Sequence, residues 1–135
     1  MKLYLLFLCF VLLSCSEVQF RAEYFVGTEL PDHEKVVKYI HHDSLGGDSE
    51  AIICLAYTEC KYKIVEQLLL KKGVYRPLSE IEPYMIEDEE EQYIKDCEGF
   101  FFYSRENPAK EHDWGYLLII LNKSKNEIYI HNVSM

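Results

Sequence analysis

The side chains best suited to binding a metal ion lie in one short segment. His42, Asp43 and Asp48 flank a turn-forming stretch with two glycines, so an imidazole and two carboxylates could meet on one divalent cation. His41 would not join them, because adjacent residues of a strand point to opposite faces. The spacing matches no known zinc pattern. We therefore expect solvated polar groups here, with no resident metal or cofactor, and keep these three residues as the ligands of an alternative, a metal-dependent protein.

Nucleophilic catalysis has no assembled motif in this chain. A catalytic cysteine needs an accessible thiol beside a base, and the sequence places no histidine next to Cys54, Cys60 or Cys97. Gly-x-Ser-x-Gly and His-Glu-x-x-His patterns do not occur. We therefore expect no catalytic residue and no enzyme. Cys54 lies in a very apolar segment and is predicted to be a core residue, which leaves Cys60 and Cys97 as the pair for a disulfide in an oxidising compartment.

One run of the chain carries only carboxylates: Glu87, Asp88, Glu89, Glu90 and Glu91. Like charges at this density resist packing, which predicts a mobile loop or a short solvated helix between residues 79 and 98. The run is a candidate surface for a basic protein partner, or it serves solubility alone. The chain has 23 acidic and 14 basic residues, a net charge of −9. That balance argues against nucleic acid as the main partner.

The first residues have the layout of a secretory signal peptide. Lys2 supplies a positive start, and the residues from Leu3 to Leu13 are almost all apolar. This apolar stretch is too short to be a membrane-spanning helix. A small residue and a cysteine, Ser14 and Cys15, follow at its end. We therefore predict export, with residues 1–14 as the signal peptide.

The segment Leu12-Leu13-Ser14-Cys15 resembles the bacterial lipobox, whose cysteine becomes a lipid-modified N-terminus. Leu13 departs from the commonest form, which has a smaller residue there. The resemblance implies acyl chains, such as palmitate, on Cys15 and anchoring in the cell membrane or outer membrane, since several chains hold a protein stably where one does not. Free secretion is the alternative, because Ser14 and Ser16 also fit cleavage before Glu17.

The elements that must position these residues are one helix and several strands. A helix is expected over residues 59–72, with Thr58 as its N-cap, Gly73 as a left-handed C-cap, and an apolar stripe that includes Ile64. Stretches rich in β-branched and aromatic residues predict strands at 36–42, 50–57, 99–103, 115–121 and 127–133. Both faces of residues 50–57 are apolar, which favours a central place in a sheet.

Short connections between the last strands favour antiparallel pairing. We predict an α+β fold, a single mostly antiparallel sheet of about five strands with one main helix on one face. Residues 15–32 show no clean period and are expected to form the lipidated N-terminus and a tether, with residues 33–135 as the domain. The course of the chain also resembles a group of small uncharacterised bacterial α+β proteins, through residues 42–48, 99–103 and 127–133. That resemblance implies no activity.

These observations favour a small acidic cell-envelope lipoprotein that acts as a non-catalytic binding module, for example an immunity or inhibitor protein. Its expected partners are the membrane, through Cys15, and a basic protein. A metal-dependent envelope protein that uses His42, Asp43 and Asp48 is one alternative. A secreted or purely structural envelope protein is the other.

Overall fold

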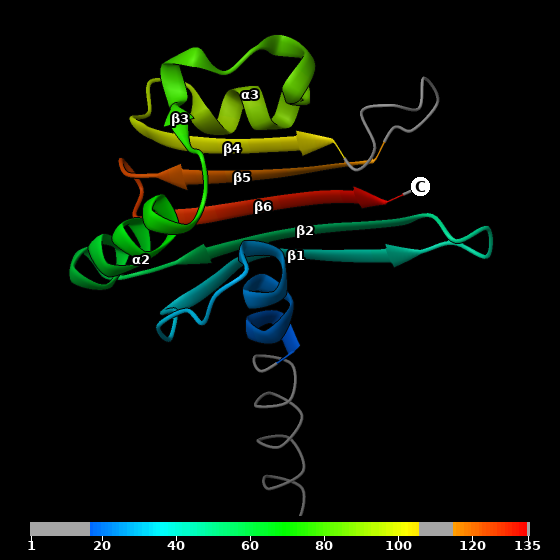
Figure 1. The fold of residues 1–135 in the computed structure, drawn as a ribbon, viewed down its shortest axis with the longest axis horizontal. Helices are drawn as coiled ribbons and strands as arrows, with labels where there is room; N and C mark the ends of the chain where they lie inside the picture. The colour runs from blue at the N-terminus through cyan, green and yellow to red at the C-terminus, as the bar shows by residue number, and fades with distance from the viewer. Residues whose placement is uncertain (1–16, 106–114, 135) are drawn as a thin grey trace, which may run out of the picture.

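The computed structural model describes residues 17–105 and 115–134, so Cys15 and the predicted signal peptide lie outside the described residues. The chain has an α+β fold with one six-stranded antiparallel sheet in the order β1-β2-β6-β5-β4-β3. Three helices accompany the sheet (Figure 1). The predicted fold class is confirmed, with a sixth, very short strand and two further helices.

The elements run along the chain as β1 (Lys35–Asp43), β2 (Ser49–Ala56), α2 (Glu59–Lys72), β3 (Arg76–Pro77), α3 (Asp88–Ile94), β4 (Gly99–Arg105), β5 (Tyr116–Asn122) and β6 (Glu127–Ser134). Two single 3-10 turns, η1 (Leu78–Glu80) and η2 (Pro83–Met85), lie between β3 and α3. A helix over residues 17–26 precedes β1. All five long strands and α2 fall where the sequence predicted them, within one or two residues at most ends.

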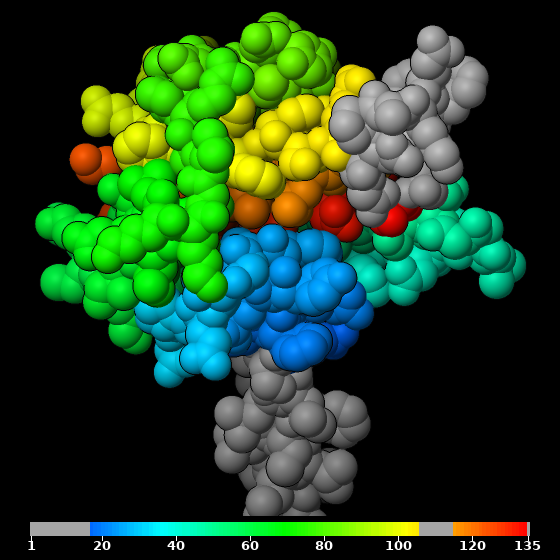
Figure 2. All heavy atoms as spheres, in the orientation of Figure 1, coloured from blue at the N-terminus to red at the C-terminus, as the bar shows by residue number. Residues whose placement is uncertain are grey.

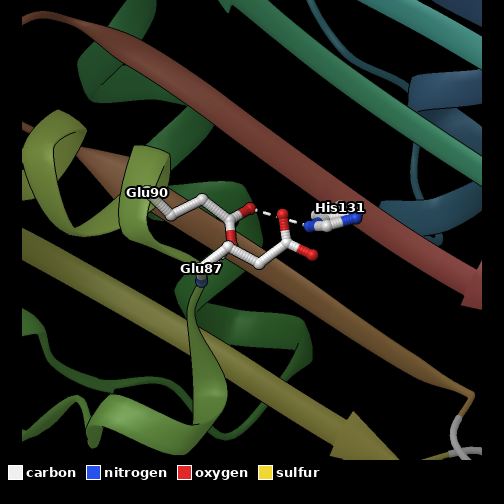
Figure 3. Close-up of side chains that lie close together, drawn as sticks. All are labelled: Glu87, Glu90 and His131. Carbon is white, nitrogen blue, oxygen red and sulfur yellow. Dashed lines mark hydrogen bonds and ion pairs between the residues drawn. The ribbon is translucent and has the colours of Figure 1, made fainter.

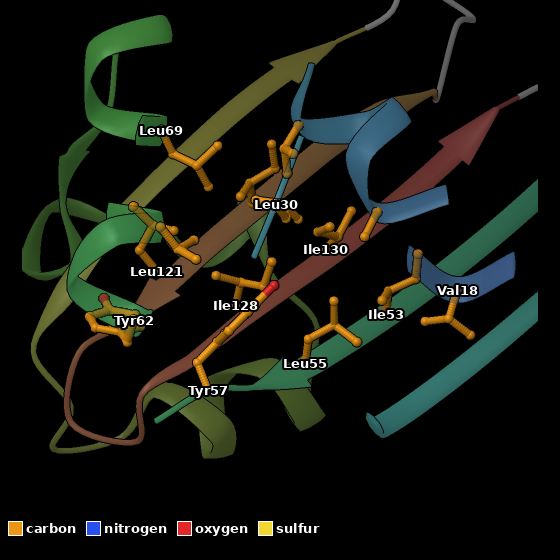
Figure 4. Close-up of a cluster of buried hydrophobic side chains, with 14 residues drawn as sticks. Val18, Leu30, Ile53, Leu55, Tyr57, Tyr62, Leu69, Leu121, Ile128 and Ile130 are labelled. Carbon is orange, nitrogen blue, oxygen red and sulfur yellow. The ribbon is translucent and has the colours of Figure 1, made fainter. Parts of the chain in front are cut away.

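The sheet buries apolar side chains on both faces, as predicted for its central strand. Ile53 and Leu55 of β2 belong to one buried cluster, and Ile52 and Cys54 belong to another on the opposite face. The first cluster packs against α2 and the N-terminal helix, and we call this side the α2 face (Figure 4). The second packs against residues 78–97, which include α3, and we call it the α3 face.

The N-terminal helix belongs to the folded domain. Val18, Ala22 and Val26 recur every four residues along residues 17–26, and each is at most 9 % exposed within the α2-face cluster. The sequence predicted a tether over residues 15–32. The helix packs against the sheet instead, because its apolar stripe continues the core (Figure 1).

The predicted N-cap of α2 is confirmed, whereas the predicted C-cap geometry is wrong. Thr58 is the N-cap, and its hydroxyl accepts a hydrogen bond from the Lys61 N–H at 3.3 Å. The left-handed cap expected at Gly73 is wrong, since this residue has φ −132° and an extended backbone. A β-carbon here would lie 3.1 Å from the ring of Tyr75, so close packing explains the glycine.

The buried side of α2 also differs from the expected stripe. Tyr62, Val65 and Leu69 are buried in it, whereas Ile64 is 50 % exposed. The buried residues of α2 are therefore spaced three and four positions apart, and the aromatic Tyr62, not Ile64, belongs to the face that contacts the sheet. No helix in the described ranges has both the length and the apolar character needed to span a bilayer.

Candidate functional site

His131 of β6 is completely buried and lies between two carboxylates. Its Nδ1 is 2.8 Å from Oε2 of Glu90 on α3, and its Nε2 is 3.1 Å from Oε1 of Glu50 on β2. Strand pairing places His131 beside Ile52 of β2, and Glu50 precedes that residue by two positions on the same face. α3 places Glu90 over β6 with only 2 % of the residue exposed (Figure 3). Packing of α3 on the sheet thus joins residues 41 positions apart.

Both ring nitrogens of His131 must carry a proton when these carboxylates are ionised, because a carboxylate only accepts hydrogen bonds. Burial lowers the pKa of His131, but the hydrogen bond and charge of Glu90, with the charges of Glu87 and Glu50, outweigh burial and raise the pKa overall. Burial raises the pKa of Glu90, while hydrogen bonds from His131, Tyr129 and the Glu87 backbone outweigh it and lower the pKa overall. Without a metal ion, the cluster is an imidazolium held by two glutamates.

Glu87 brings a third carboxylate to this cluster. Glu87 and Glu90 form a capping box at the start of α3, in which the Glu87 N–H donates to Oε1 of Glu90 at 3.0 Å. Figure 3 shows both carboxyl groups directed toward His131. One ligand atom from each of the three residues lies within 4.8 Å of the other two. In the described ranges, this is the set of histidine, cysteine and acidic side chains that could hold a metal ion.

Two tyrosine hydroxyls complete the surroundings. The Tyr116 hydroxyl lies 3.2 Å from Nδ1 of His131, and the Tyr129 hydroxyl donates a hydrogen bond to Glu90. Burial raises the pKa of both phenols, and the charge of Glu90 raises each further. Both hydroxyls therefore stay protonated at neutral pH and orient the charged groups beside them.

The metal ligands proposed from the sequence are not brought together in this way. His42, Asp43 and Asp48 are all exposed near the β1–β2 turn and do not form a set of converging ligand atoms. Asp43 pairs instead with His41, at 3.4 Å between Oδ1 and Nε2. The Arg21 guanidinium also contacts that Nε2 at 3.1 Å. His41 thus lines the α2 face, as strand alternation predicted, and is separated from His42.

The acidic run is divided between structural and exposed residues. It starts α3, in agreement with the expected short helix, but Glu90 is buried rather than solvated. This expectation failed because the charge of Glu90 is compensated by His131, and sequence alone showed no partner for it. The members left as a candidate partner surface are Asp88, Glu89 and Glu91. One of them, Glu89, already pairs with Lys38 at 3.2 Å.

The three cysteines of the domain are free. Cys60 is exposed on α2, whereas Cys97 packs partly buried on the α3 face, so the sheet separates the two thiols expected to pair. Cys54 is buried, as predicted. Burial, and then the charge of Glu127, raise its pKa to about 12, which leaves an unreactive thiol.

A groove of about 630 Å³ opens on the α2 face, beside the N-terminal helix and the ends of β4, β5 and β6. Figure 2 shows the hollow above the blue helix, with β5 and β6 (orange and red) behind it. Its lining includes both aromatic and hydrogen-bonding side chains, among them Arg21, Tyr24, His41, Phe102, Ser104 and Asn132. Sequence reasoning missed this site because its residues come from six separate elements. Its volume is typical of ligand pockets.

Comparisons with protein-family models, with curated proteins and with solved structures found no match for this chain. The function must therefore be inferred from the residues of this chain, above all from the groove on the α2 face and the buried cluster on the α3 face.

Proposed function

We propose that this protein is exported, anchored to the cell envelope by lipid on Cys15, and acts by binding a partner in the groove on the α2 face. The groove carries the proposal, because it combines a ligand-sized volume with mixed aromatic and polar lining. The lipobox resemblance at Leu12 to Cys15 supports the anchor. An immunity or inhibitor role is one concrete form of this function.

An extended peptide segment of a partner protein fits the groove best. β3 pairs only with Phe100 and Phe101 of β4, and Tyr75 just before β3 contacts Phe102. Among the described residues, no strand lies beside the outer edge of β4 from residue 103 to 105. Ser104 of this edge lines the groove, together with the neighbouring Phe102. A peptide could add to such an edge through main-chain hydrogen bonds while its side chains enter the groove.

The reactive groups of the described residues favour binding over catalysis. The Cys54 thiol has a pKa raised to about 12, chiefly by burial. Both nitrogens of His131 are engaged by carboxylates, which removes it as a free base. A nucleophile with an adjacent base would argue for catalysis, and these two residues do not form one.

The anchor is tested with Cys15→Ala in the full chain, expressed in a bacterial host. We expect the wild-type protein to partition into membranes and to carry acyl groups on its N-terminal peptide by mass spectrometry. The variant should lose both the modification and the detergent-dependent extraction. Unchanged processing and partitioning would contradict the lipid anchor and favour free secretion.

The groove is tested with a photo-crosslinking amino acid at Ser104, and with the same amino acid at exposed Ser79 in η1 as the matched control. Cells are irradiated, and adducts on each purified protein are identified by mass spectrometry. We expect one protein adduct that forms at Ser104 and not at Ser79. The same adducts at both positions, or none at Ser104, would contradict a binding groove.

A further inference from the structure

We propose that Glu87, Glu90 and His131 form a binding site for a divalent transition-metal ion, with Zn²⁺ as the ion of best fit. One imidazole nitrogen and two carboxylates are donors that zinc accepts, and three protein ligands leave positions for solvent. The site lies on the α3 face, across the sheet from the groove. Tyr116 lines the groove and also contacts His131, but the two proposals use different ligands and different test variants, so each can fail without the other.

The distances require only a small adjustment. Ligand atoms bound to zinc at about 2.0–2.2 Å in tetrahedral geometry stand about 3.3–3.6 Å apart. Nδ1 of His131 and Oε2 of Glu90 are 2.8 Å apart, joined by a hydrogen bond. Metal binding displaces the Nδ1 proton, and the two atoms then need to separate by less than about 1 Å to admit the ion.

The three donors are already oriented by a second layer of hydrogen bonds. Nε2 of His131 donates to Glu50 at 3.1 Å, which directs Nδ1 toward Glu87 and Glu90. Metal-bound histidines are commonly held by a carboxylate on the far nitrogen in this way. Glu90 accepts a hydrogen bond from the Glu87 N–H through its other oxygen, Oε1, and it also accepts one from the Tyr129 hydroxyl. This arrangement fixes the ligands before an ion arrives.

The charges of the cluster point to a cation independently of its geometry. Three carboxylates, Glu50, Glu87 and Glu90, face one imidazolium, so the cluster carries a net negative charge. No lysine or arginine in the described ranges forms an ion pair with any of the three. A divalent ion that replaces one proton reduces this excess.

A metal ion can reach the site from solvent, because one of its three ligands lies at the protein surface. Glu87 is exposed while Glu90 and His131 are buried. An ion can therefore bind first to the Glu87 carboxylate at the surface and reach the buried donors without opening the core. The exposure of Glu87 also makes it the safest ligand to substitute, because folding does not depend on burying its side chain.

The test uses the purified full chain, stripped with a chelator and titrated with Zn²⁺ by calorimetry. We expect one site with micromolar or tighter affinity and a rise in melting temperature on zinc addition. Glu87→Gln should weaken the affinity at least tenfold, and Glu50→Gln should weaken it about 10–100-fold through the lost outer contact. Glu91→Gln, an exposed neighbour outside the cluster, should bind as the wild type does.

Co²⁺ gives a spectroscopic control against binding by the free thiols. Nitrogen and oxygen ligands predict visible d–d bands without an intense near-ultraviolet sulfur-to-cobalt band. These bands should disappear in His131→Asn, with circular dichroism used to confirm its fold. A sulfur charge-transfer band, equal affinities for the Glu87 and Glu91 variants, or the absence of one-to-one zinc binding would overturn the proposal.

Discussion

Glu90→Gln, measured in the metal-free protein, gives the sharpest test of the buried cluster. Glu90 is 2 % exposed and its carboxylate pairs with a His131 side chain that is fully buried. Removing one partner of such a pair costs about 3–5 kcal/mol, because the other charge stays buried without compensation. The amide oxygen of glutamine still accepts from Nδ1–H, so we expect a loss of about 2–4 kcal/mol in the free energy of unfolding.

The matched control is Glu91→Gln, one residue further along the same helix and exposed. Both variants remove one negative charge and keep the side-chain shape, so they differ chiefly in burial and partner. The control should change stability by less than about 0.5 kcal/mol. For a domain of this size, about 3–4 °C per kcal/mol is expected, which places Glu90→Gln about 6–16 °C below the wild type.

Urea unfolding in the presence of a chelator measures both variants, with equal m-values as the condition for comparison. A double variant with His131→Asn should lose less than the sum of the single losses, by at least about 1 kcal/mol, since the two side chains form one pair. If Glu90→Gln were as mild as Glu91→Gln, or if the double loss were simply additive, the buried ion pair would be refuted.

Three further predictions concern the rest of the fold. Val18 is 3 % exposed, so Val18→Ala should lower the free energy of unfolding in urea by about 1–2 kcal/mol. Val74 is 83 % exposed, so the control Val74→Ala should change stability by less than about 0.5 kcal/mol. Equal effects would mean that the N-terminal helix is a tether after all. At pH 8, iodoacetamide should label the exposed Cys60, whereas Cys54, with about one thiolate in 10⁴ molecules, should react only after unfolding. Similar labelling rates for the two cysteines, measured by mass spectrometry, would disprove the buried thiol. Gly99→Ala should lower the free energy of unfolding by at least about 2 kcal/mol, because Gly99 has φ +152° and a β-carbon would overlap a backbone carbonyl of β5. A variant of wild-type stability would show that β4 does not enter the sheet this way.

The sequence predicted the elements whose signals are local. The five long strands are dense in β-branched and aromatic residues, and α2 has an N-cap and basic residues in its last turn. β3 spans only two residues, too few for any periodic pattern. The N-terminal helix was missed because its stripe of Val18, Ala22 and Val26 follows directly on the apolar signal segment and reads as irregular once that segment is set aside.

The candidate sites depend on contacts that no local pattern specifies. The Glu87-x-x-Glu90 spacing carries a helix-start signal, and it was not recognised within a run of five acidic residues. Even with that signal, the partner of Glu90 is 41 residues away on another strand. Alternation along β6 puts His131 on one face of the sheet, but only the packing of α3 decides what covers that face. The groove likewise assembles residues from six elements, so sequence spacing gives no hint of it.

The buried cluster is hard to explain by stability alone. Burying an imidazolium and a carboxylate costs several kcal/mol of solvation for each ion, and apolar residues of similar volume often give an equal or more stable fold. Glu90 and Glu50 satisfy the two N–H groups of His131, yet Glu87 adds a third carboxylate beside it. Each added negative charge stabilises the imidazolium less than the first and repels the others. Hydrogen bonding to His131 accounts for Glu90 and Glu50, whereas the proposed cation site also gives the Glu87 carboxylate a role beyond the capping box, and this third carboxylate is the physical reason to expect a metal at this position.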